Sequence, residues 1–199
     1  MQKKVNVLTD TKAIELVQDD SGRVIGIKAA SKGDEFFIRA RKGVILAAGG
    51  FGANLKTVAV FDPRLKGLPS NCSSGSTGDM LFAARKIGAS AVDLTEIQCL
   101  PGPISNKGIR VRFHNDVRRF VFVNDEGKRF VDERARRDEL KEKILVQRNK
   151  SCYCIIDNDG LETLDLLVRR DAIRAAETGD AVKAPSLEEL AFALNIPAE

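Results

Sequence analysis

The sequence contains no apolar run near the ~20 residues that a membrane-spanning helix needs, so we expect no membrane span. Its N-terminus, MQKKVNVLTD, also lacks the apolar core that a signal peptide requires. Nothing in the chain itself therefore directs it out of the cytoplasm, and we expect a cytoplasmic protein.

Metal ligands and cysteine pairs are scarce as well. His114 is the single histidine, and no two of the four cysteines form a C-x-x-C pair. Cys152 and Cys154 share one face of a predicted strand, where they fit best as core or half-buried thiols. With so few ligands we expect neither a metal site nor a disulfide framework.

The charge is small and mixed in sign. The 199 residues include 32 basic and 28 acidic ones, a net charge of +4, which does not indicate nucleic acid as a partner. The stretch RVRFHNDVRRFVFV interleaves arginine with phenylalanine, yet its alternation fits a strand with one apolar face. A non-catalytic binding module for an anionic partner stays open as an alternative function.

The first third of the chain predicts a small antiparallel meander. Apolar and polar residues alternate with period two, and turn residues stand at hairpin spacing at 19–22 and 31–34. The continuous apolar run GVILAA, residues 43–48, then predicts a strand buried on both faces. The alternating runs are VNVL, KAIELVQD, RVIGIKA and EFFIRARKG.

Helix and strand patterns alternate in the rest of the chain. Ser76 or Thr77 can cap a helix that Gly88 ends. LPGP then favours a boundary near residues 95–103. Beyond it the predicted elements are a hairpin in RRFVFVNDEGKRFVDE with NDEG as its turn, a helix from RRDELKEKIL, a strand in SCYCIIDND, a helix ending at Gly179, and a helix that starts with a capping box from Ser186 to Glu189.

The stretch GVILAAGGFGANLK resembles a cofactor-binding turn without matching the dinucleotide fingerprint. Gly50 and Gly52 supply the first two glycines of G-x-G-x-x-G, but Leu55 stands where the third belongs. Glycine allows close backbone approach to a ligand, because it has no Cβ to collide with it. From these residues alone, a plain tight turn and a ligand contact are equally good interpretations.

Three stretches in order resemble one enzyme family. GVILAAGGFG, STGDMLFAARKIGA and VNDEGKRFVDERARRD are similar to segments of the flavoproteins that include soluble fumarate reductases, succinate dehydrogenase flavoprotein subunits, urocanate reductases and ketosteroid dehydrogenases. The resemblance implies an α/β plus α+β fold: the tail of a Rossmann-like FAD-binding domain with a β-meander over 1–97, then most of an α+β substrate-capping domain over 98–199, incomplete at its C-terminus.

The resemblance also implies FAD as cofactor, held in part by two short segments. In the family the fingerprint strand precedes this region, so we expect it to lie before Met1. We therefore expect the chain by itself to bind little or no FAD and to be inactive. The implied cofactor-binding residues are Ala48, Gly49, Gly50, Phe51, Gly52, Thr77, Gly78 and Asp79.

For catalysis the resemblance implies an oxidoreductase that reduces or forms a C=C bond activated by a carbonyl or carboxylate. Flavin exchanges hydride with the small unsaturated substrate, Arg137 delivers the proton, and a separate domain or protein donates electrons. The other interpretation of Arg134, Arg136 and Arg137 is a solvated charge cluster at a helix start.

Two departures from the family pattern bear on the substrate. Leu100 stands where fumarate reductases have a histidine, and Phe113 and Asp116 stand where they have a glutamate and an arginine that relay protons. We therefore predict that the substrate is not fumarate. Arg112 and His114 lie near enough to replace the relay, so the predicted substrate-binding residues are Leu100, Arg112, Phe113 and His114.

Overall fold

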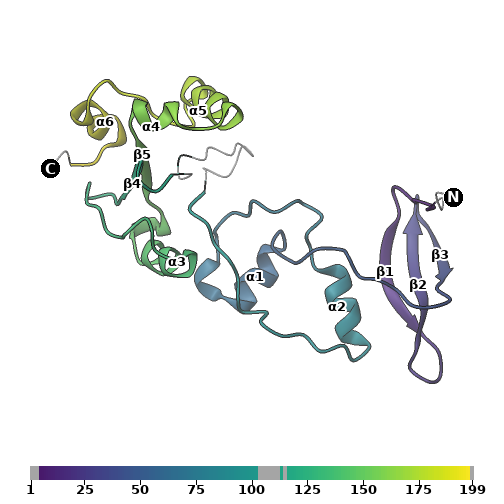
Figure 1. Cartoon of the computed structure of the whole chain (residues 1–199). Coiled ribbons are helices and arrows are strands. Elements are labelled where there is room, and N and C mark those ends of the chain that lie inside the picture. Colours follow the sequence, from purple (N-terminus) through teal and green to yellow (C-terminus); the bar gives the residue numbers. More distant parts are fainter. Residues whose placement is uncertain (1–4, 103–112, 114–115, 198–199) are drawn as a thin grey trace. The chain divides into compact units, whose positions relative to one another are not determined.

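The computed structural model describes residues 5–102, 113 and 116–197 (Figure 1). The chain divides into two compact units, Met1–Glu96 and Ile97–Glu199, and each is described by itself. Both combine short helices with a small antiparallel sheet. No helix in the described part of the chain is long and apolar enough to cross a membrane.

The first unit contains the predicted meander. Strands β1 (Lys12–Gln18), β2 (Val24–Ser31) and β3 (Asp34–Arg39) pair antiparallel in the order β1-β2-β3. Leu16 of β1 is buried against one face of a helix, and Ala29 of β2 is fully buried. The stretch VNVL, residues 5–8, is not a strand, and its apolar side chains are exposed.

The run GVILAA does not form the strand that its composition predicts. Residues 43–48 have no strand assignment, and Ile45 is 93% exposed. A strand buried on both faces needs hydrogen-bonding neighbours and covering elements. Among the described residues neither is present for this run, although Val44 packs against the core of the first unit.

Helices of the first unit follow the glycine turn. Helix α1 (Leu55–Phe61) and the short η1 (Pro63–Leu65) were not predicted. Helix α2 (Asp79–Lys86) begins at Gly78, whose φ is +80°, and no side chain caps it, so the predicted Ser76 or Thr77 cap is wrong. Met80, Ala83 and Ala84 on α2 bury one face of the helix against β1 and form the core.

The second unit is built on strands β4 (Phe120–Val123) and β5 (Tyr153–Ile156), which pair antiparallel. Its core contains Phe120, Phe122 and Leu140, with both half-buried cysteines of β5 and its flank packed against them. The helices are α3 (Arg137–Leu145), η3 (Arg148–Lys150), α4 (Asn158–Glu162), α5 (Leu166–Thr178) and α6 (Leu187–Leu194).

Two helix ends agree with the sequence prediction. Helix α5 ends at Gly179, which has a left-handed φ of +76° that glycine adopts without strain. Helix α6 begins at Ser186, whose hydroxyl accepts a hydrogen bond from the N–H of Glu189 at 3.2 Å. Local capping chemistry therefore sets these boundaries.

The predicted hairpin around NDEG forms only its turn. The Asn124 N–H donates to the Lys128 carbonyl at 3.0 Å, and a single bridge joins Val123 to Arg129, but β4 takes β5 as its partner. The physical reason lies in one side chain. The N–H of Phe122, which a hairpin ladder would use, donates instead to a carboxylate oxygen of Glu133 at 2.9 Å.

Candidate functional site

The glycine turn is bound to the start of α2 by two hydrogen bonds, and a third closes the turn itself. The Ala53 N–H donates to the Ser76 carbonyl at 2.9 Å, and the Asn54 side-chain amide donates to the Thr77 carbonyl at 3.3 Å. The Asn54 N–H closes the turn itself by donating to the Phe51 carbonyl at 2.8 Å. The structure therefore brings together the two segments that the sequence predicts to share a cofactor.

Asn54 and Phe51 fix the shape of this turn. The Asn54 side-chain oxygen accepts from the Thr57 N–H at 3.1 Å and so caps α1. The ring of Phe51 packs at centroid distances of 5.3 Å from Phe61 and 6.3 Å from Phe82. Phe51, predicted to bind cofactor, is thus also an aromatic anchor of the first unit.

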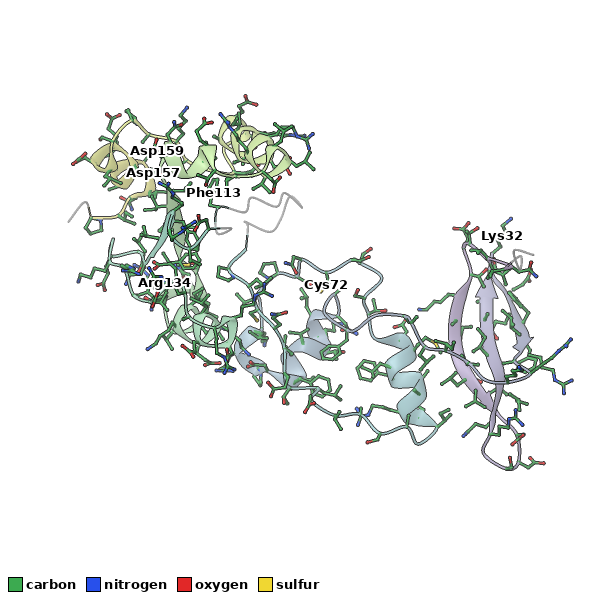
Figure 2. The ribbon with its side chains drawn as sticks, in the orientation of Figure 1. Lys32, Cys72, Phe113, Arg134, Asp157 and Asp159 are labelled. Carbon is green, nitrogen blue, oxygen red and sulfur yellow. The ribbon has the colours of Figure 1, made fainter. Side chains whose placement is uncertain are left out.

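Two of the predicted cofactor glycines lie against the chain's own side chains. A Cβ on Gly78 would lie 2.7 Å from the Cβ of Phe51, and the φ of Gly78 is +80°, so its surroundings require a glycine without any ligand. A Cβ on Gly52 would overlap only the sulfur of Cys72, an exposed side chain that can rotate away and that is labelled in Figure 2.

Gly49 and Gly50 differ, because the described residues leave space beside them. Gly49 has a φ of +75°, a left-handed conformation that favours glycine, and a Cβ there would meet only the Ser76 hydroxyl at 3.7 Å. A Cβ on Gly50 would have no atom of a described residue within 4 Å, and the φ of Gly50 is not left-handed. Among the described residues, neither packing nor backbone strain therefore requires a glycine at position 50.

Thr77 and Asp79 lie at the start of α2. The Asp79 carboxylate pairs with the Lys12 ammonium at 2.8 Å, and this contact, together with the Thr77 side chain, lowers the pKa of Asp79. The pair joins β1 to α2, so Asp79 has a structural role in the first unit. Ala48 is exposed directly before the glycine turn.

The arginine cluster of the second unit consists of Arg134, Arg136 and Arg137, and these side chains differ in whether they pair with a carboxylate. Arg137 is the first residue of α3, and its exposed side chain has no hydrogen-bond or ion-pair partner among the described residues. Arg136 donates to both carboxylate oxygens of Asp138, at 3.0 and 2.9 Å. Arg134 is exposed and, in the part of the chain that is described, its guanidinium has no carboxylate partner (Figure 2).

The predicted substrate residues are only partly described. Leu100 is exposed and Phe113 is half-buried, while Arg112 and His114 lie outside the described residues. Asp116 accepts two hydrogen bonds from the Arg118 side chain, which lowers the pKa of Asp116 to about 2. Asp116 is therefore a paired carboxylate at neutral pH and cannot take the place of a cationic relay group.

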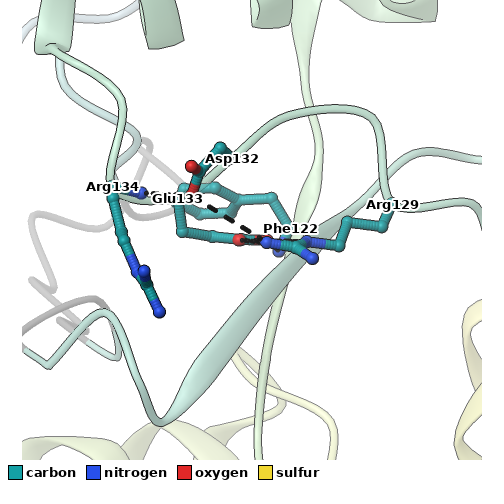
Figure 3. A network of polar contacts seen from close by, with 5 residues as sticks. All are labelled: Phe122, Arg129, Asp132, Glu133 and Arg134. Carbon is teal, nitrogen blue, oxygen red and sulfur yellow. Dashed lines mark hydrogen bonds and ion pairs between the residues drawn. The ribbon is translucent and has the colours of Figure 1, made fainter.

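The sequence analysis missed Glu133, the buried centre of a polar network shown in Figure 3. Its side chain is 3% exposed and accepts from the Phe122 N–H and from the guanidinium of Arg129. Burial acts to raise the pKa of Glu133, but these hydrogen bonds outweigh burial and lower it. No sequence signal marked this pair, because the i,i+4 rule applies to helices and residues 129–133 are not helical. Beside Glu133, residues 129–134 and Val117 line an open pocket.

The family model described as "FAD binding domain" matches residues 1–193. The chain belongs to this family. The urocanate reductase of Eggerthella lenta is 39% identical over 172 residues, which cover 82% of this chain and 28% of that protein. A fumarate reductase (cytochrome) of Shewanella frigidimarina is 33% identical over 182 residues, covering 92% of this chain and 32% of that protein.

Two solved structures also match the chain. A flavocytochrome c3 fumarate reductase in an open conformation matches 94% of this chain and 32% of its own length, with 28% identity and a TM-score of 0.69. A 3-ketosteroid dehydrogenase from Rhodococcus jostii matches 94% of this chain and 36% of its own length, with 26% identity and a TM-score of 0.59. The chain thus spans about a third of the length of these relatives.

Proposed function

We propose that the chain is part of an FAD-dependent oxidoreductase that reduces or forms a C=C bond activated by a carbonyl or carboxylate. Relatives are named for urocanate, fumarate and acrylate, which share such a bond. The observation that carries the proposal is Gly50, whose open main chain lies in a turn hydrogen-bonded toward α2. Residues 1–97 would then belong to the FAD-binding domain and 98–199 to the substrate cap.

FAD, when bound, supplies hydride exchange with the substrate. The chain's own contribution is main chain at Gly49 and Gly50, where an added Cβ would meet, among the described residues, only the Ser76 hydroxyl beside Gly49 at 3.7 Å. Phe51 and Asn54 hold that main chain in place through the ring contacts and hydrogen bonds described above. Ala48, Thr77 and the first N–H groups of α2 complete the proposed cofactor side.

Arg137 is the proposed proton donor to the substrate carbon. Arginine is a very weak acid, so the role requires that Arg137 regain its proton from a relay and that the site stabilise developing negative charge. An exposed guanidinium without a carboxylate partner among the described residues is free to face a substrate. Asp138 pairs instead with Arg136, which donates to both of its oxygens.

Substrate choice is proposed to differ from that of fumarate reductases. Leu100 supplies no charge or hydrogen bond for a second carboxylate, and Phe113 supplies no proton. Asp116, held by Arg118, carries the opposite charge to the relay arginine it replaces. We therefore propose a less polar unsaturated substrate, with Leu100, Arg112, Phe113 and His114 around it.

Gly50→Val tests the cofactor side in the complete flavoprotein that contains this chain. The added side chain would keep FAD from the main chain, so we expect affinity for FAD to fall at least about tenfold, roughly the loss of one hydrogen bond. Stability should change little, because no described residue lies within 4 Å of the new Cβ. Titration of the apoprotein with FAD, followed by flavin fluorescence, measures the effect.

Gly102→Val is the matched control. Gly102 also lacks a left-handed φ, and a Cβ there would meet only the Leu100 carbonyl at 3.5 Å, yet it lies outside the proposed cofactor segments. Equal affinity of the Gly50 and Gly102 variants for FAD would refute the cofactor role of the glycine turn.

The 199-residue chain alone should bind little or no FAD. It has no G-x-G-x-x-G motif, and in dinucleotide-binding folds that motif opens the helix whose N-terminus holds the diphosphate. The purified chain, mixed with FAD and passed through a desalting column, should show no flavin absorbance. A stoichiometric flavin band would show that the glycine turn and α2 suffice for binding.

A further inference from the structure

We propose that Glu133 is a positioning residue that holds Arg137 in place for proton transfer; the inference rests on the proposed function. Glu133 is four residues before Arg137, at the other end of the exposed segment that carries Arg134 and Arg136. That segment is attached to β4 at two points.

The first attachment is the Glu133 carboxylate. One of its oxygens accepts from the Phe122 N–H in the middle of β4 at 2.9 Å. The Arg129 Nε donates to both oxygens, at 3.1 and 3.0 Å, and a terminal nitrogen of Arg129 donates to the second oxygen at 2.5 Å (Figure 3). With its side chain buried and both oxygens in use, Glu133 has one fixed position.

The second attachment is Leu140, one turn into α3. It is buried and packs in the same core cluster as Phe120 and Phe122 of β4. Arg137 lies between the two attachments, so β4 restrains the segment on both sides of it. The backbone around the first attachment is further restrained, since the Ala135 N–H donates to the Asp132 carbonyl at 2.9 Å.

Glu133 is poorly suited to transfer a proton itself. Its side chain is buried, and the contacts from Phe122 and Arg129 favour its charged form, so it has no proton to give at neutral pH. Arg129 is itself half-exposed, and its guanidinium is paired with the Glu133 carboxylate. The network can therefore affect chemistry only through the geometry of the residues that follow it, and an error of ~1 Å in a catalytic group can cost ~100-fold in rate.

A double-mutant cycle in the complete flavoprotein tests the inference. Glu133→Ala should lower kcat about tenfold or more, because the segment before α3 loses its attachment to β4. In a background of Arg137→Lys the same change should lower kcat no further, since the group that Glu133 positions is already gone. Flavin reduction by the electron donor should be equal in all four proteins.

Leu164→Ala is the control for a merely structural effect. Leu164 is buried in the same unit and is not part of the Arg129–Glu133 network, so its removal should lower thermal stability with the same small effect on kcat in both backgrounds. If Glu133→Ala does not fold, Glu133→Asp replaces it in the cycle. Its carboxylate is one methylene shorter and cannot keep all contacts, so turnover should again fall only when Arg137 is present.

Three outcomes overturn the inference and are distinguishable. If Arg137→Lys lowers turnover and the Glu133 substitution lowers it by the same further factor in that background, Glu133 has no positioning role. The same conclusion holds if the folded Glu133 variants keep full turnover. In both cases the proposed function stands. If Arg137→Lys keeps full turnover, the proton-donor assignment and the positioning role fail together.

Discussion

Arg137→Lys should lower turnover of the complete flavoprotein by at least ~10²-fold, the lower end of what general acid catalysis contributes. Lysine keeps the positive charge but replaces the planar guanidinium with a compact ammonium on a flexible stem. A residue that only provided positive charge would tolerate the change, whereas one that delivers a proton to a single carbon would not. Steady-state turnover of the unsaturated substrate measures the loss, and reduction of the flavin by its electron donor should be unaffected.

Arg134→Lys and Arg136→Lys are the matched controls. Arg136 is engaged by Asp138, and Arg134 is exposed three positions from Arg137, so both variants should retain most of their turnover. An equal loss in all three variants would mean that the cluster acts through its overall charge. A silent Arg137→Lys would contradict the assignment at its most specific residue, an outcome that the unusual relay positions Phe113 and Asp116 make worth testing first.

The sequence was sufficient to predict those elements whose position depends on residues close to one another in the chain. Alternation of period two placed the meander of Lys12–Arg39, and Gly179 and Ser186 placed two helix ends. These elements depend on residues only a few positions apart, so their signals lie within one window. The resemblance identified the family in the same way, through three short stretches that the match over residues 1–193 supports.

The errors arise where distant groups compete for the backbone. The run GVILAA has the composition of a buried strand, but no described neighbour pairs with it, so composition alone misplaced it. The hairpin failed because the Glu133 side chain takes the Phe122 N–H that a ladder would use. Periodicity cannot reveal such a bond, since it depends on a buried carboxylate eleven positions along the chain.

We expect the largest loss of stability from a substitution in the same part of the molecule, at Phe122. Phe122 is 1% exposed and packs edge-on against Phe120 at a centroid distance of 5.1 Å, at the centre of the second unit. Phe122→Ala should destabilise this unit by about 3–5 kcal/mol, the usual cost of emptying a buried phenylalanine site. Because a domain is stable by only ~5–15 kcal/mol, this loss is a large share of the total.

Tyr153 makes the measurement specific to this unit of the 199-residue chain. It is the one tyrosine in a sequence without tryptophan, and on β5 it pairs with Val123 of β4, so its fluorescence during urea unfolding reports on the strand pair that Phe122 supports. Phe192→Ala is the control, since that ring is 88% exposed on α6 and its removal should shift the midpoint by less than ~0.5 kcal/mol in free energy. Equal midpoints for the two variants would mean that Phe120, Phe122 and Leu140 are not the core that stabilises this unit, and the attachment of the Arg137 segment to β4 would lose its physical basis.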